Sequence, residues 1–128
     1  MRGAGRRAIA RLKLKLQLYC GDAVAMGPGK ADLLEAIARE GSISAATRAL
    51  GMSYRRGWLL VDTMNRCFAR PLVAARPGGG GKAGATLTPE GKRALAAYRD
   101  LARQVERGAS GEALQTLEAA IRASPGET

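Results

Sequence analysis

Polar and cationic side chains gather at one point of the chain, in the run Ser53, Tyr54, Arg55 and Arg56. A serine can cap a helix with its hydroxyl, and side chains in the first turn of a helix that enters a DNA groove reach the base edges. An arginine there can donate two hydrogen bonds to guanine, which contributes about 1–3 kcal/mol of discrimination between bases. The alternatives are solvated arginines and a Tyr54 ring that leans on its own helix instead of stacking on the DNA backbone. We predict that these four residues bind DNA.

The sequence contains no candidate catalytic or metal-binding residues. Histidine is absent, and Cys20 and Cys67 are far apart in the chain, so neither a zinc-ligand cluster nor a Cys-His pair can be assembled within one chain. No pair of carboxylates stands out as a general acid and base. We therefore predict a protein that is not an enzyme and holds no metal or cofactor, with both cysteines reduced and packed.

The glycine-rich segment 76–85 raises the alternative of nucleotide binding, because glycine followed by lysine is part of a phosphate-binding loop. That loop needs a glycine five positions before the one preceding Lys82, and a hydroxyl after the lysine. This chain has Arg76 and Ala83 at those positions. The spacing argues against an ATPase.

The charge balance favours a polyanionic partner. The 128 residues include 21 Lys and Arg against 11 Asp and Glu, a formal net charge of +10. A cationic surface attracts nucleic-acid phosphates and releases their counterions. No apolar run approaches the roughly 20 residues that a bilayer crossing needs, and the basic start lacks the continuous apolar segment of a secretory signal. We expect one soluble cytoplasmic domain with tails and no membrane partner.

The elements that would position the cationic run begin with a flexible basic arm over 1–10 and a half-buried strand over 11–18. The strand is predicted because Leu12, Leu14, Leu16 and Leu18 alternate with polar residues. A turn at 27–30 should lead to a helix with Asp32 at its start, and Gly41 should end that helix. These features predict a strand followed by the first helix of a small core.

The second and third helices follow in the order of a helix-turn-helix. Ser44 is predicted to cap the second helix and to offer its hydroxyl and the adjacent backbone to a phosphate, and Gly51 to end that helix. After Ser53, a stripe of apolar residues recurs every three or four positions and is predicted to lie in the core. Its members are Trp58, Val61, Met64 and Phe68.

A hairpin and a long helix complete the pattern. Residues 72–75 and 86–87 are predicted as strands around the glycine-rich segment, whose Arg76 and Lys82 would follow the DNA backbone or a minor groove. The alternative is a solvated connection without a DNA role. Thr88, Pro89 and Glu90 predict the start of a long helix, and a shorter helix is expected over 112–123.

This order predicts a mostly α fold with a small β component: a winged helix-turn-helix with an N-terminal strand, a three-helix core, a β-hairpin wing, a long C-terminal helix and a short last helix. The segments ISAATRALGMSYRRGWLLVDTMN, PLV and GGGGKAGATLTPEG resemble the N-terminal DNA-binding domain of the ModE family of molybdate-responsive regulators. The resemblance covers roughly Leu12 to Val105. The helix-turn-helix alone is also similar to that of LysR-type regulators, and the wing favours the narrower family. The predicted domains are a basic arm over 1–10, a winged helix-turn-helix over 11–106, and a C-terminal helix and tail over 107–128.

The resemblance implies a homodimeric transcriptional regulator that binds double-stranded DNA. It implies that the N-terminal strand and the long helix contribute to dimerisation, through Leu14, Leu16, Tyr98, Leu101 and Val105. The last three could instead pack onto their own domain. Members of the family carry an oxyanion-binding module after the long helix, and the residues that follow it here are too few to form one. We therefore expect regulation without direct molybdate sensing, with a separate effector or partner subunit as one possibility. A general nucleic-acid or nucleoid-associated protein and an oxyanion (molybdate) binding protein remain the alternatives.

Overall fold

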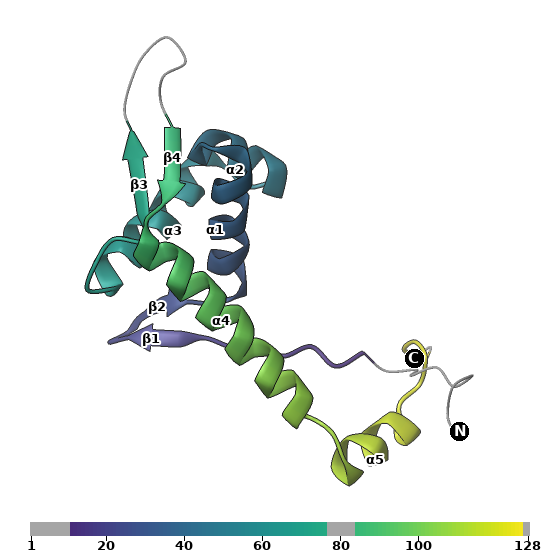
Figure 1. Ribbon diagram of the computed structural model, residues 1–128. Coiled ribbons are helices and arrows are strands. Elements are labelled where there is room, and N and C mark those ends of the chain that lie inside the picture. Colours follow the sequence, from purple (N-terminus) through teal and green to yellow (C-terminus); the bar gives the residue numbers. More distant parts are fainter. Residues whose placement is uncertain (1–10, 77–83, 127–128) are drawn as a thin grey trace. The chain divides into compact units, whose positions relative to one another are not determined.

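The computed structural model describes residues 11–76 and 84–126. This part of the chain is mostly helical with a small β component, as the sequence predicts (Figure 1). Its strands form two antiparallel hairpins, of which the sequence predicted only the wing. In chain order the elements are β1 (Leu18–Cys20), β2 (Ala23–Met26), α1 (Pro28–Glu40), α2 (Ile43–Leu50), α3 (Tyr54–Cys67), β3 (Val73–Arg76), β4 (Gly84–Leu87), α4 (Pro89–Gly108) and α5 (Glu112–Ala120). The order is that of a winged helix-turn-helix.

The strand predicted over 11–18 is wrong for all but its last residue. Residues 11–17 form no regular element, and β1 begins only at Leu18, where it pairs with β2 across a turn containing Gly21. Alternating leucines form a half-buried strand only beside a partner strand, and here Leu12 and Leu14 stay exposed. Leu16 alone of the predicted strand's interior packs against the core.

Helix α1 begins earlier than predicted. Pro28 is its first residue and Gly27 its N-cap, so the predicted turn at 27–30 is wrong and Asp32 lies inside the helix. Proline suits a first helical position because its fixed φ fits the helix and its missing N–H has no partner there. Gly41 ends the helix in the left-handed conformation with φ 83°, as predicted.

The core lies where the three helices and the wing meet. Leu33, Leu34 and Ile37 of α1 are fully buried, and Figure 1 shows the two hairpins at opposite ends of this helix. At its C-terminal end, the backbone N–H of Ala85 in β4 donates to the Gly41 carbonyl over 2.9 Å. The other elements contribute the buried side chains Met26, Ile43, Ala46, Val61, Met64, Leu72, Val73, Ala85, Leu87 and Tyr98.

The start of α4 is fixed to the base of the wing. Thr88 caps the helix as predicted: its hydroxyl accepts from the Gly91 N–H over 3.0 Å and donates to the Pro71 carbonyl over 2.7 Å. The Thr88 N–H donates to the Leu72 carbonyl over 2.9 Å. A Cβ on Gly91 would collide with that same carbonyl, so only glycine permits this approach.

The chain divides into two compact units. One comprises Lys15–Ala102, and the other comprises Met1–Leu14 with Arg103–Thr128. In the second unit the short helix α5 ends at Ala120, three residues before the predicted end. Within the described ranges, the structure has no helix with the length and apolarity needed to cross a membrane.

Candidate nucleic-acid interface

Ser42, not Ser44, caps α2. The Ser42 hydroxyl accepts from the Ala45 N–H over 3.0 Å, whereas Ser44 lies inside the helix and its hydroxyl accepts from the Arg48 guanidinium over 2.8 Å. Both serines match the preference for a capping residue, and the structure selects the one with extended backbone, φ −156° and ψ 155°. The predicted cap is therefore wrong. A phosphate contact by Ser44 stays a prediction, because its N–H still belongs to the first turn of α2.

The turn between α2 and α3 is short and strongly specified. Gly51 takes φ 70°, and the Met52 N–H donates to the Thr47 carbonyl over 3.0 Å. Ser53 caps α3 as predicted, since its hydroxyl accepts from the Arg56 N–H over 3.1 Å. Where the helices cross, Gly57 faces the buried Thr47, and a Cβ at position 57 would collide with the Thr47 methyl. The absent side chain lets α3 pack closely on α2.

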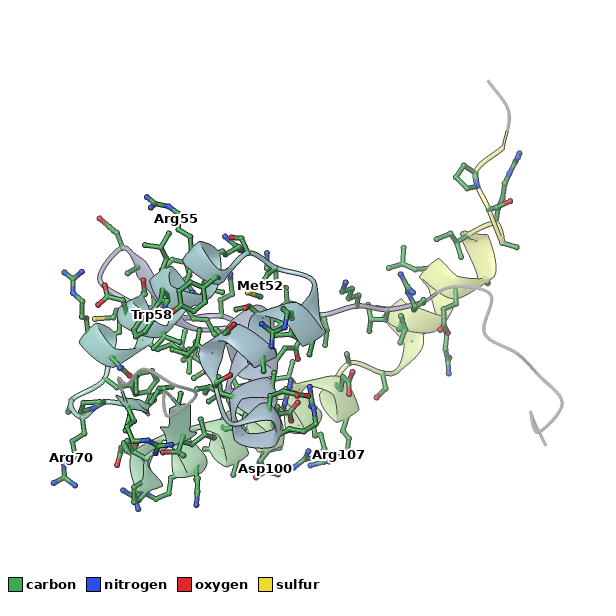
Figure 2. The ribbon with its side chains drawn as sticks, turned by 90° about the horizontal axis from the view of Figure 1, so that it is seen from above. Met52, Arg55, Trp58, Arg70, Asp100 and Arg107 are labelled. Atoms are coloured by element: carbon green, nitrogen blue, oxygen red, sulfur yellow. The ribbon has the colours of Figure 1, made fainter. Side chains whose placement is uncertain are left out.

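This crossing decides which face of α3 points outward. Gly57, Val61 and Met64 are buried on the inner face. The predicted DNA-binding residues of the first turn, Tyr54, Arg55 and Arg56, are all exposed, and Figure 2 shows Arg55 pointing away from the helices. The structure thus brings together the residues that the sequence predicts for base contacts.

Trp58 departs from the prediction. It was expected in the core, but it is 39% exposed and belongs to the outer face of α3 (Figure 2). Its ring lies edge-on to that of Tyr54, with centroids 6.2 Å apart and planes at 81°. Together with Arg55, Leu59 and Asp62 the two rings line a shallow hollow. Trp58 is three residues before Val61, so the two side chains lie about 60° apart around the helix axis. Sequence periodicity does not show whether a residue at that angle lies in the core or at its edge.

Asn65 is a positioning residue that the sequence reasoning missed. Its side-chain oxygen accepts from the N–H groups of Leu72 over 2.8 Å and Val73 over 3.1 Å, and its amide donates to the Val73 carbonyl over 3.1 Å. These bonds tie the last turns of α3 to the first strand of the wing. The available signal was an asparagine four residues after Val61, on the apolar side of the helix.

The wing is a regular antiparallel ladder up to its tip. Val73 pairs with Leu87, and Arg76 pairs with Gly84. Arg76 is exposed at the end of β3. Lys82, predicted to bind DNA from the tip, lies outside the described residues, as does the basic arm over 1–10.

Positive charge is concentrated beside the first turn of α3. Burial lowers the pKa of Lys30 in α1, and the nearby positive charge of Arg56 lowers it further. On the outer face of α3, Arg66 pairs with Asp62 over 3.4 Å. A phosphate that approaches Lys30 and Arg56 relieves the repulsion between their positive charges.

The predicted dimerisation residues fall into two groups. Tyr98 is 5% exposed and its hydroxyl donates to the Leu16 carbonyl over 2.8 Å, so these two residues pack within their own unit. Leu14, Leu101 and Val105 are each 38% exposed. The last two are four residues apart on α4 and share one side of it.

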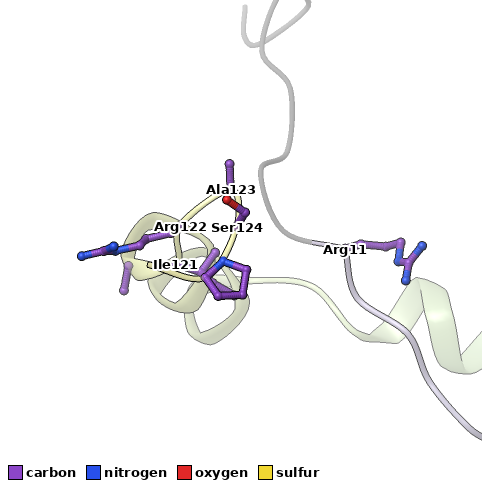
Figure 3. A pocket seen from close by; sticks show the side chains of 7 residues that line it. Arg11, Ile121, Arg122, Ala123 and Ser124 are labelled. Atoms are coloured by element: carbon purple, nitrogen blue, oxygen red, sulfur yellow. The ribbon is translucent and has the colours of Figure 1, made fainter. Parts of the chain in front are cut away.

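The thiols and acids of the described residues form no metal site. Among the described residues, no three His, Cys, Asp or Glu side chains gather closely enough to hold a metal ion. Cys20 and Cys67 are free, and Cys20 is exposed, which contradicts its predicted packing. Burial raises the pKa of the Cys67 thiol, and the neighbouring Cys20 thiol raises it further, so the fold brings these two residues together. A separate hollow is lined by Arg11 and residues 120–125 (Figure 3).

The arrangement of α2, α3 and the wing defines the class: a winged helix-turn-helix with its arginines on the outward helix. No protein-family model matches the chain. The chain is 42% identical over 102 residues to the molybdenum-pterin-binding protein MopB of Rhodobacter capsulatus, which covers 80% of this chain and 36% of MopB. It is 39% identical over 95 residues to the molybdenum transport protein ModE of Azotobacter vinelandii, covering 74% and 34%. It is 36% identical over 98 residues to the DNA-binding transcriptional dual regulator ModE of Escherichia coli (strain K12), covering 77% and 35%.

The chain is therefore related to ModE and Mop proteins. It spans little more than a third of the length of these curated relatives. Their names describe molybdenum binding, transport and regulation of transcription, and none of the three names describes an enzyme.

Proposed function

We propose that the chain is a sequence-specific DNA-binding transcriptional regulator of the ModE type, which acts on double-stranded DNA in the cytoplasm. The observation that carries the proposal is the first turn of α3, where Arg55 and Arg56 are exposed two and three residues after the Ser53 cap. In helix-turn-helix proteins this turn enters the major groove. The relation to the DNA-binding regulator ModE of Escherichia coli supports the same role.

The contacts divide by purpose. Arg55 and Arg56 donate to base edges, with guanine as the preferred partner because its O6 and N7 accept two parallel hydrogen bonds. Ser44 and Arg76 contact phosphates, which fixes the register of the protein without selecting a sequence. Lys82 joins them from the wing.

Replacement of Arg55 and Arg56 by Ala tests this assignment. We expect the double variant to lose selection of its preferred duplex while it keeps its helical circular dichroism. Arg107 and Arg122, both exposed and outside α2 and α3, give a matched control that removes the same charge. Unchanged footprints on a selected duplex in the Arg55 and Arg56 variant would refute the base-reading role.

The proposed active form is a homodimer that contacts two half-sites, formed through the exposed side of α4 that carries Leu101 and Val105. Leu14 is proposed to join this contact. Sedimentation equilibrium of a Leu101→Asp, Val105→Asp variant should show monomers. Leu117→Asp, at a leucine of α5 that is 67% exposed, serves as the control. An unchanged dimer in the first variant would place the interface elsewhere.

The match to MopB, named for molybdenum-pterin binding, favours oxyanion binding as a second candidate function. Calorimetry of the chain with molybdate and tungstate separates the two functions. Heat released at micromolar ligand, with no selection of a DNA sequence, would establish the second candidate in place of the first.

A further inference from the structure

The first two turns of α3 expose apolar side chains, which a helix used only for polar base contacts does not need. Tyr54 is 54% exposed, Trp58 39% and Leu59 56%. These three side chains, here called the α3 apolar patch, line the same hollow. Exposed apolar side chains that cluster in this way mark a surface that a partner covers.

The patch lies within the charged surface of the proposed DNA interface. Arg55 lines the same hollow and Arg56 follows it in the chain, and the one carboxylate that lines the hollow, Asp62, is paired with Arg66 over 3.4 Å. A partner that covers the patch therefore has to present apolar groups inside a strongly anionic surface. Duplex DNA meets this condition better than a protein surface does, because phosphates flank the groove that holds the base edges.

One group in the major groove has matching chemistry. Base edges there present hydrogen-bond donors and acceptors, and the apolar exception is the C5-methyl group of thymine. If the patch met polar edges alone, their hydration would be lost without replacement bonds. The Tyr54 and Trp58 rings pack edge-on against each other, and Leu59 lines the same hollow, so the patch offers an apolar surface to a methyl group.

We propose that the α3 apolar patch selects thymine by contact with its C5-methyl group, next to the bases contacted by Arg55 and Arg56. The proposal rests on the proposed function as a sequence-specific DNA-binding protein. It adds two specificity-determining residues, Trp58 and Leu59, to the predicted four. It also gives a role to the exposed Trp58, whose exposure the predicted place in the core did not explain.

Uracil substitution tests the proposal without altering the protein. A duplex is selected by the full chain from a random-sequence pool, and each thymine in its footprint is replaced by uracil, which removes the methyl group and keeps the pairing edge. We expect uracil at one or more positions in the major groove to weaken binding roughly three- to five-fold per methyl lost. Uracil outside the footprint is the control on the DNA side.

Variants on the protein side connect the methyl to the patch. Leu59→Ala should reduce the affinity for the thymine duplex and abolish the difference between thymine and uracil. Leu59 is more than half exposed and outside the core, so the fold should be retained, which circular dichroism checks. Leu117→Ala, at an exposed leucine of α5, should keep the full thymine preference.

The outcomes separate this inference from the function on which it rests. A selected duplex that tolerates uracil everywhere, or that lacks thymine opposite α3, overturns the methyl contact and leaves sequence-specific binding intact. Failure to select any duplex overturns both. Loss of self-association in Leu59→Ala, with an unchanged thymine preference, would show that a second copy of the chain covers the patch, and would also overturn the proposal.

Discussion

At the scale of single residues, Tyr98 joins the start of the larger unit to α4. Its ring is 5% exposed and its hydroxyl donates to the Leu16 carbonyl over 2.8 Å. A net hydrogen bond of this kind contributes about 0.5–1.5 kcal/mol to the free energy of unfolding. Tyr98→Phe keeps the ring and removes the bond, so we expect a loss of that size in urea unfolding at pH 7.

Because the Tyr98 hydroxyl can ionise, the difference in free energy of unfolding between wild type and Tyr98→Phe depends on pH. Burial is the main cause that raises the pKa of Tyr98, and the charge of Asp32 adds to it while Arg99 opposes it. The native state therefore binds more protons than the unfolded state as pH passes the unfolded pKa of about 10. The contribution is complete below that pH and falls as pH rises through the folded pKa. We expect the stability difference between wild type and Tyr98→Phe to be constant from pH 7 to about pH 9 and then to shrink. A constant difference up to pH 11 would contradict the assignment.

At the scale of elements, the close crossing of α2 and α3 depends on Gly57. A Cβ there would collide with the Thr47 methyl, and Thr47 cannot rotate freely because it is buried and its hydroxyl donates to the Ser44 carbonyl over 2.9 Å. Overpacking costs about 1–3 kcal/mol, whereas alanine gains up to about 1 kcal/mol in helix propensity. We expect Gly57→Ala to lower the free energy of unfolding by about 1–2 kcal/mol. Gly29→Ala in α1, where nothing lies within 4 Å of the added Cβ, should be neutral or stabilising.

Asn65 couples α3 to the wing, so its replacement should affect two elements together. Asn65→Ala leaves two N–H groups and one carbonyl without their partner, at about 1–3 kcal/mol for a buried group left unsatisfied. We expect a loss of stability in that range and faster amide exchange at Leu72 and Val73. Asn65→Asp keeps the acceptor and loses the donor, so it should protect both N–H groups from exchange. Equal exchange in the two variants would contradict the role of the acceptor.

The elements also show what the sequence could specify. Local signals predicted the ends of α1 and α2 at Gly41 and Gly51, and the caps at Ser53 and Thr88, because capping and left-handed backbone depend on residues within one turn. The strand over 11–18 was wrong, because pairing depends on a partner that local alternation does not identify.

Contacts between elements account for two further errors in the candidate interface. Trp58 was placed in the core because periodicity gives an approximate angle around a helix, and the close approach of α2 at Gly57 fixes the actual one. Asn65 was missed because its partners are seven and eight residues away, in an element that forms around it. The exposed arginines were found because they follow a cap directly.

At the scale of the whole molecule, net charge sets how strongly the proposed DNA binding depends on salt. The chain carries 21 Lys and Arg against 11 Asp and Glu. Each phosphate neutralised on duplex DNA contributes about 0.9 to the slope of log K against log salt, so binding should fall steeply between 50 and 200 mM salt. A general nucleic-acid binder shares this slope, so the slope alone does not separate a regulator from a nucleoid-associated protein.

The ratio of the affinities for a selected and a random duplex does distinguish a regulator from a nucleoid-associated protein. Base contacts from Arg55 and Arg56 add free energy that counterion release does not supply, so the affinity ratio of a selected duplex to a random one should be about a thousand-fold or more and should persist as salt rises. Fluorescence anisotropy of both duplexes over a salt series measures the slope and the ratio together. The Arg55→Ala, Arg56→Ala variant should retain most of its affinity for random duplex and lose the ratio, whereas the Arg107→Ala, Arg122→Ala control should retain the ratio. A wild-type ratio near one at every salt concentration would identify a charge-driven binder and refute sequence-specific regulation.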